Sequence, residues 1–161
     1  SPWSVMEVLL VSRDNVIEIK NLDKIYVTKN GDVHALDNVD LQVYQEEFIT
    51  CVGQSGCGKT TLLKIISGLL PKTKGTCQVN GHDVTGPLSD VGMVFQAPVL
   101  PKWRNVIDNV MLPVEILGLD EDEYSKRAME LIKVTGLEGF ETKYPKELSG
   151  GMQQRVSISR A

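Results

Sequence analysis

Residues 53–61 read G-Q-S-G-C-G-K-T-T and match the phosphate-binding pattern G-x-x-x-x-G-K-[ST] at every fixed position. The glycines leave consecutive backbone N–H groups free to converge on phosphate oxygens, because no Cβ stands in the way. The pattern therefore predicts a nucleotide site formed by Gly53, Gln54, Ser55, Gly56, Cys57, Gly58, Lys59, Thr60 and Thr61. The alternative is a chance glycine-rich turn, which average composition disfavours.

Two side chains of this loop have distinct expected roles. Lys59 would reach the terminal phosphates as a point charge, and Thr60 would offer its hydroxyl to Mg²⁺. A helix is predicted over residues 59–67, with Gly68 as its stop. The positive N-terminal end of that helix would face the phosphates.

The flanking segments predict the strands of an α/β domain. Residues 48–52 and 91–95 are short apolar runs of the kind found in buried parallel strands. Other segments alternate apolar and polar residues, as antiparallel strands do, namely 16–26, 39–43 and 75–84. Turns are expected around residues 30–32 and 80–81, which contain Asn-Gly pairs.

A second glycine motif lies at residues 148–155, which read L-S-G-G-M-Q-Q-R. Ser149 can cap a helix that begins near Gly151. Gly150 and Gly151 would let the first N–H groups of that helix approach a phosphate, which predicts a second anion site. The alternative is a capped surface helix without a ligand.

Together with residues 53–61 and with Gln96, residues 148–155 resemble the ATP-binding cassette (ABC) family, whose signature begins L-S-G-G-Q. The resemblance covers nearly the whole chain. Met152 stands where the commonest signature has Gln, which is a familiar variant when Gln-Gln-Arg follows. The resemblance implies an α/β P-loop NTPase fold with an antiparallel β subdomain and a helical subdomain, and it implies ATP and Mg²⁺ as ligands.

The family resemblance also implies roles for residues outside the phosphate loop. Tyr26 matches the aromatic residue that stacks on adenine; packing within its strand is the alternative. Gln96 matches the glutamine that touches the attacking water and, with Thr60, Mg²⁺. The signature residues would contact ATP held by a second subunit in a head-to-tail dimer: Ser149, Gly150, Gly151 and Gln153.

From residue 97 onward the composition predicts helices punctuated by prolines. Residues 98–110 look like the segment of nitrate, sulfonate and taurine importer ATPases that meets the membrane subunit, so the region 97–115 is expected to contact a transmembrane permease. For Leu100 and Trp103 the alternative is the core of the helical subdomain.

A surface helix is predicted over residues 121–134. Asp120 would cap its N-terminus, acidic residues occupy its first turn, and Gly136 would stop it. The acidic run at its start is therefore interpreted as a helix start and not as a metal site.

The expected organisation has four parts: an upstream segment 1–15, an antiparallel β subdomain with the phosphate-loop core over 16–96, a helical subdomain over 97–148, and the start of the signature helix over 149–161. In the family a strand ending in Asp-Glu and a switch histidine come after the signature. Residues 115–121 also end in Asp-Glu, but they precede the signature and contain Gly118. We therefore expect a fragment that lacks the C-terminal half of the core sheet and does not hydrolyse ATP by itself.

Composition narrows the class of protein. The 161 residues include 21 acidic and 17 basic side chains, giving a net charge of −4, so no nucleic-acid partner is expected. No apolar run approaches the roughly 18 residues of a membrane span, and a cytoplasmic protein, peripheral on the inner face of the cell membrane, is expected. Cys51, Cys57 and Cys77 form no C-x-x-C pair, which predicts buried free thiols.

These observations predict the ATP-binding subunit of an ABC importer that couples ATP hydrolysis to solute uptake. Two alternatives stay open. One is a nucleotide-binding fragment without turnover. The other is an ABC-type ATPase of DNA repair or chromosome structure. Such proteins carry a long coiled coil between the phosphate loop and the signature, and no sustained heptad pattern lies between Gln96 and Leu148.

Overall fold

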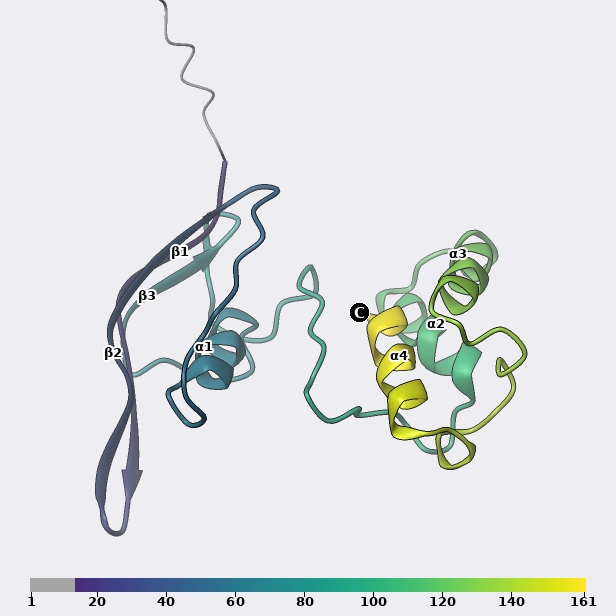
Figure 1. Cartoon of the computed structure of the whole chain (residues 1–161). Helices are drawn as coiled ribbons and strands as arrows, with labels where there is room; N and C mark the ends of the chain where they lie inside the picture. Colours follow the sequence, from purple (N-terminus) through teal and green to yellow (C-terminus); the bar gives the residue numbers. More distant parts are fainter. Residues whose placement is uncertain (1–13) are drawn as a thin grey trace, which may run out of the picture. The chain divides into compact units, whose positions relative to one another are not determined.

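The structure, a computed structural model, describes residues 14–161. The expected upstream segment therefore lies outside the described residues except for Asp14 and Asn15. The chain divides into two compact units, Ser1–Leu88 and Ser89–Ala161 (Figure 1). The predicted β subdomain with the phosphate-loop core, 16–96, thus extends beyond the first unit, because residues 89–96 lie in the second.

The first unit is built on a four-stranded antiparallel sheet in the order β2-β1-β3-β4, of which β1, β2 and β3 are labelled in Figure 1. Its strands are β1 (Asn15–Thr28), β2 (Gly31–Tyr44), β3 (Lys74–Val79) and β4 (His82–Asp83). The three alternating segments of the sequence are thus strands, as predicted. Asn80 and Gly81 both have positive φ, 50° and 78°, as a tight hairpin turn between β3 and β4 requires.

Helix α1 (Lys59–Ile66) packs on the sheet through Leu62, Ile65 and Ile66. Its C-terminal stop is the predicted Gly68, whose φ is 75° and whose N–H donates to the carbonyl of Ile65 at 3.0 Å. A Cβ at Gly68 would lie 1.8 Å from the carbonyl oxygen of Gly86, so only glycine fits there. The residue that ends α1 is thus also the point at which the later backbone, at Gly86, passes close to the helix.

The predicted parallel strands at residues 48–52 and 91–95 are wrong, since neither segment is a strand. The side chains of Phe48 and Val52 are 94% and 90% exposed, although their sequence is typical of a buried strand. A parallel strand needs neighbours for its N–H and C=O groups, and within residues 14–161 the strands present pair only with one another, all antiparallel. The apolar composition of these two segments is therefore not sufficient to form a strand, because neither has a neighbouring strand to pair with among the described residues.

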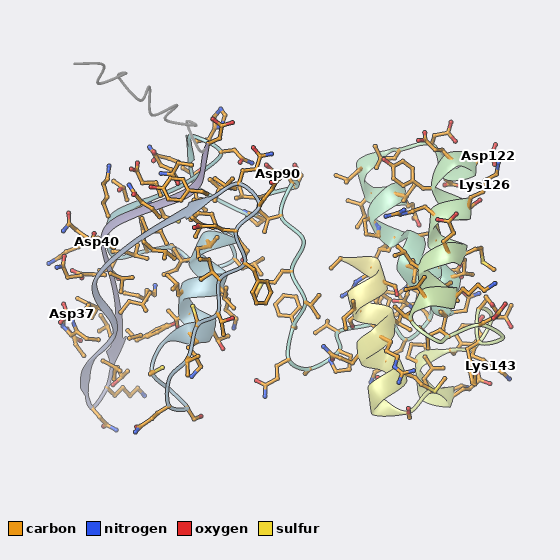
Figure 2. The ribbon with its side chains drawn as sticks, turned by 45° about the horizontal axis from the view of Figure 1, so that its top comes forward. Asp37, Asp40, Asp90, Asp122, Lys126 and Lys143 are labelled. Carbon is orange, nitrogen blue, oxygen red and sulfur yellow. The ribbon has the colours of Figure 1, made fainter. Side chains whose placement is uncertain are left out.

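The second unit consists of helices: α2 (Val106–Leu117), α3 (Glu121–Val134), the 3-10 turn η1 (Pro145–Glu147) and α4 (Gly150–Arg160). Their shared core is apolar and contains Leu100, Val106, Val110, Ala128, Ile132, Leu137, Leu148 and Val156. On α3, Ala128 and Ile132 face this core one turn apart, whereas Asp122 and Lys126 lie on the exposed part of the helix (Figure 2). Among the described residues no helix is both long and apolar enough to cross a bilayer.

Polar caps begin the helices of the second unit. The Asp120 carboxylate accepts hydrogen bonds from Asp122 N at 2.9 Å and Glu123 N at 3.1 Å, as its position before an acidic first turn predicts. Gly118, with a φ of 64°, ends α2, so the Asp-Glu pair that follows it belongs to the start of α3 and not to a strand.

Glu115 forms a two-pronged ion pair with Arg104 at 2.6 and 3.0 Å, and this hydrogen bonding lowers the pKa of the Glu115 carboxyl.

Ile132→Ala is expected to lower the free energy of unfolding of the second unit by about 2 to 5 kcal/mol, because it leaves a cavity among fully buried side chains. Met129→Ala is the matched control, since Met129 lies on the same helix but is exposed. Urea denaturation followed by helical circular dichroism measures both changes. Equal effects of the two substitutions would contradict the assigned core.

Candidate functional site

The phosphate loop is held on the sheet through a glycine. Gly58 precedes α1 with a φ of 100°, and a Cβ there would lie 2.4 Å from the carbonyl oxygen of Ala35 and 2.9 Å from Leu36 Cδ2. The backbone of the loop therefore touches β2 at a distance that only glycine allows. No side chain caps the N-terminus of α1, so the N–H groups of its first turn are left for another acceptor.

Lys59 folds back across this loop. Its Nζ donates to the carbonyl oxygen of Gly53 at 2.6 Å and to that of Gln54 at 2.7 Å. The ammonium group thus lies inside the turn formed by the loop, beside the start of α1. A cation that lies against the backbone at a helix N-terminus attracts polyphosphate.

The other polar side chains of the loop are accessible. Ser55 and Thr60 are exposed, and Thr60 is the second residue of α1. Its hydroxyl is an oxygen ligand of the kind that Mg²⁺ takes from a protein while phosphates supply further ligands. Among residues 14–161 no group of three or more His, Cys, Asp and Glu side chains could hold a metal by itself.

The cysteines correct one expectation. Cys77 is buried in β3, and this burial raises the pKa of its thiol. Cys51 and Cys57, however, are exposed, contrary to the prediction of buried thiols. Cys51 lies in segment 48–52, which is not a strand, and Cys57 lies in the open phosphate loop, where its Sγ is 3.5 Å from Lys59 Nζ.

Tyr26 lies close to the phosphate loop. Its hydroxyl is 3.5 Å from Thr61 Oγ1 in the first turn of α1, and the residue is 38% exposed. The sheet and α1 thus bring Tyr26, from a distant part of the sequence, to the loop that carries Lys59. Its partial exposure differs from that of Leu22, which is fully buried on the same strand.

The second glycine motif has the predicted cap. The Ser149 Oγ accepts a hydrogen bond from Met152 N at 3.2 Å, and α4 begins at Gly150. Neither Gly150 nor Gly151 has a positive φ, and a Cβ at either position would have no neighbour within 4 Å. Packing within the described residues therefore does not require glycine there, and the start of α4 is open to an approaching ligand.

Two glutamines of α4 hold the backbone around them. Gln153 Nε2 donates to the carbonyl oxygens of Pro145 at 2.9 Å and Leu148 at 3.3 Å, so its amide braces the turn before the motif. Gln154 Nε2 donates to the carbonyl oxygen of Phe95 at 3.0 Å. This contact fixes the backbone just before Gln96, which is itself exposed. No local sequence pattern indicates this role of Gln154, because its partner lies 59 residues away.

The glycine loop precedes a helix without a side-chain cap, and Lys59 folds back onto the loop carbonyls. This combination defines a P-loop nucleotide-binding protein. A family model described as ABC transporter matches residues 36–161. The chain belongs to this family.

Individual relatives agree with that assignment. The chain is 49% identical over 144 residues to an uncharacterized ABC transporter ATP-binding protein of Methanocaldococcus jannaschii, covering 89% of this chain and 54% of the relative. It is 44% identical to a nitrate import ATP-binding protein of a Synechocystis species, covering 90% and 54%. It is 42% identical to a taurine import ATP-binding protein of Burkholderia thailandensis, covering 85% and 53%. The chain therefore spans about half the length of the curated relatives it matches.

A solved structure shows the same fold. It is a dimeric ATP-binding cassette in a post-hydrolysis state bound to ADP and Pi. The TM-score is 0.81 at 34% identity, covering 89% of this chain and 68% of the other. The predicted class, a partial ABC ATPase with an antiparallel sheet and helices, is confirmed.

The two loop glycines with positive φ provide a test of this geometry. Gly56→Ala and Gly58→Ala both place a Cβ on a left-handed backbone, which costs about 1 to 2 kcal/mol. Only Gly58→Ala also drives that Cβ into the Ala35 carbonyl, whereas Gly56 has open space around it. We expect Gly58→Ala to lower the stability of the first unit more, measured by urea denaturation and by hydrogen exchange of the amides around Ala35. A larger effect of Gly56→Ala would contradict the seating of the loop on β2.

Proposed function

We propose that this chain is the ATP-binding part of an ABC importer, in which hydrolysis of ATP to ADP and phosphate is coupled to solute uptake. One observation carries the proposal: Lys59 Nζ lies within the loop, 2.6 and 2.7 Å from two loop carbonyls, at the uncapped start of α1. Phosphate oxygens would be stronger acceptors than these carbonyls, because they carry charge.

The phosphate loop would hold the polyphosphate through Lys59 and through the backbone N–H groups of Gly53, Gln54, Ser55, Gly56, Cys57, Gly58, Thr60 and Thr61. The adenine would stack on Tyr26, whose hydroxyl lies beside the same helix turn. Tyr26 and the phosphate loop belong to the same unit of the chain, which supports this proposal.

For hydrolysis, the Thr60 hydroxyl and the Gln96 amide would hold Mg²⁺, and Gln96 would orient water. The ion, when bound, neutralises charge that develops on the phosphates. Both side chains are exposed, so each is accessible to a ligand.

The signature would act on ATP held by a second copy of the protein in a head-to-tail dimer. Ser149, Gly150 and Gly151 would approach the phosphate from the open start of α4. Gln153 would contribute by bracing this turn through Pro145 and Leu148. The dimeric state of the similar solved cassette supports this assembly.

The membrane partner would be a permease that contacts residues 97–115. Trp103 in this region is 79% exposed, whereas Leu100 is buried in the helical core, so Trp103 is the better contact residue. We propose a cytoplasmic location, peripheral on the inner face of the membrane. The names of the nitrate and taurine relatives support import as the direction of transport, and other subunits would select the solute.

Lys59→Ala is expected to weaken binding of ATP by about 2 to 3 kcal/mol, because it removes a charge-assisted contact to the phosphates. Lys64→Ala is the matched control, since Lys64 lies in the last turn of the same helix. Isothermal titration of the 161-residue chain with Mg-ATP measures both. Equal affinity of the Lys59→Ala variant and the parent would refute the phosphate cradle.

Sharing of the signature between subunits predicts complementation in a form of the protein that has the length of its curated relatives. Ser149→Arg and Lys59→Ala subunits should each be inactive alone. A mixed dimer would have one site with both faults and one intact site, so mixing should restore ATP hydrolysis, measured as phosphate release. Activity no greater than that of either variant, despite demonstrated exchange of subunits, would argue against the shared site.

A further inference from the structure

Lys24 occupies a position that a lysine rarely takes in a strand. On β1 it lies in the row of alternate residues that contains Leu22 and Tyr26, on one face of the sheet. Only 9% of its surface is exposed, compared with 0% for Leu22. Its ammonium group is therefore carried into the packed part of the first unit.

A buried ammonium needs partners that compensate for the water it has lost. Lys24 Nζ donates to the carbonyl oxygen of Pro71 at 2.7 Å and lies over the ring of Tyr26, 5.2 Å from its centroid. Within residues 14–161 Lys24 forms no ion pair with a carboxylate. The aromatic ring is thus one of the two groups that stabilise this charge, through a cation–π interaction.

The backbone around Lys24 is irregular. The pairing of β1 with β2 shifts register on both sides of Lys24, whose partner is Leu36. Such bulges redirect a side chain, and here two carboxylates secure the irregularity. Asp23 Oδ1 accepts from Asn38 N at 2.7 Å, and Asp40 Oδ1, labelled in Figure 2, accepts from Asn21 N at 2.7 Å.

The Tyr26 ring is consequently held at two points. Lys24 covers a face of the ring, and Thr61 lies 3.5 Å from its hydroxyl. Thr61 is two residues beyond Lys59 on α1, so the ring is fixed relative to the phosphate cradle.

We propose that Lys24 is a positioning residue for nucleobase recognition: it fixes the Tyr26 ring as a platform at a set distance from the phosphate loop. The inference rests on the proposed function, in which that loop holds ATP. In this role Lys24 contacts the Tyr26 ring and not the phosphates. Removal of the Lys24 ammonium therefore weakens the contribution of the base to ATP affinity and leaves the contribution of the phosphates unchanged.

A purely structural role for Lys24 would be to tie down the turn that contains Pro71. That turn has other attachments to β1, however. Thr73 N donates to the Asp23 carbonyl oxygen at 2.9 Å, and Ile25 N donates to Thr73 Oγ1 at 3.0 Å. Loss of the Lys24 ammonium leaves both bonds in place, so the position of the ring is the feature that changes most.

The test compares ATP with inorganic tripolyphosphate, which offers phosphates without a base, by titration calorimetry in the presence of Mg²⁺. Lys24→Met keeps the length of the side chain and removes its charge. It should weaken ATP binding about 5- to 30-fold, the range of a partly to fully desolvated cation–π contact, and change tripolyphosphate binding less than about 2-fold. Lys24→Arg keeps the cation and should recover most of the ATP affinity.

Lys20→Met is the control, because Lys20 lies on the same strand but is exposed and paired with Glu18. It should leave the affinities for both ligands unchanged. Tyr26→Ala should reproduce the loss of Lys24→Met, and the double variant should lose no more than Tyr26→Ala alone, because both act through one ring.

The outcomes separate this inference from the proposed function. An unchanged ratio of ATP to tripolyphosphate affinity in Lys24→Met, or an equal loss of both, overturns the positioning role while the cradle stands. A parent chain that binds ATP no more tightly than tripolyphosphate overturns it as well. A parent chain that is folded by circular dichroism and binds neither ligand refutes the proposed function, and the inference falls with it.

Discussion

The close contact between Gly58 and the carbonyl of Ala35 is the constraint on which the first unit depends. It lets the chain turn into α1 through a left-handed residue directly against β2, where any Cβ would collide. Because the turn is this tight, α1 begins without a side-chain cap, and Lys59 is left to satisfy the loop carbonyls with its ammonium group. The features that suit a polyphosphate are thus consequences of how the loop is seated on the sheet.

The two helices that begin at glycine motifs, α1 and α4, differ in how they leave their first N–H groups available to an anion. At α1 the N-cap is Gly58 and no side chain accepts from the first turn, whereas at α4 the Ser149 hydroxyl accepts from Met152 N. The first start therefore offers more unpaired N–H groups, and it has a lysine beside them. The second offers an uncrowded approach, since no atom lies near the missing Cβ of Gly150 or Gly151. The first arrangement suits enclosure of an anion and the second suits contact with an anion that another surface already holds.

Segment 48–52 is apolar but forms no strand, because the described sheet offers it no edge for parallel pairing. Hydrophobic residues of a parallel strand are buried by layers on both faces, and their backbone groups need neighbouring strands. Among the described strands none provides such an edge, so Phe48 and Val52 lie in solvent. The antiparallel sheet, by comparison, pairs through the β1–β2 and β3–β4 hairpins and through a connection over residues 45–73 that includes α1, and all its strands lie within this chain.

Local chemistry was enough to predict the helix after the glycine loop, the caps at Asp120 and Ser149, the stop at Gly68 and the Asn80–Gly81 turn, because each depends on backbone conformation or hydrogen bonds within a few residues. The antiparallel strands followed from their alternation. Tertiary structure alone decided which apolar runs became strands, which cysteines were exposed, and that Gln154 holds the backbone before Gln96. It also decided that Lys24 is buried with its ammonium group over the Tyr26 ring. Burial and long-range pairing depend on what the rest of the chain places nearby, and no local pattern of residues records that.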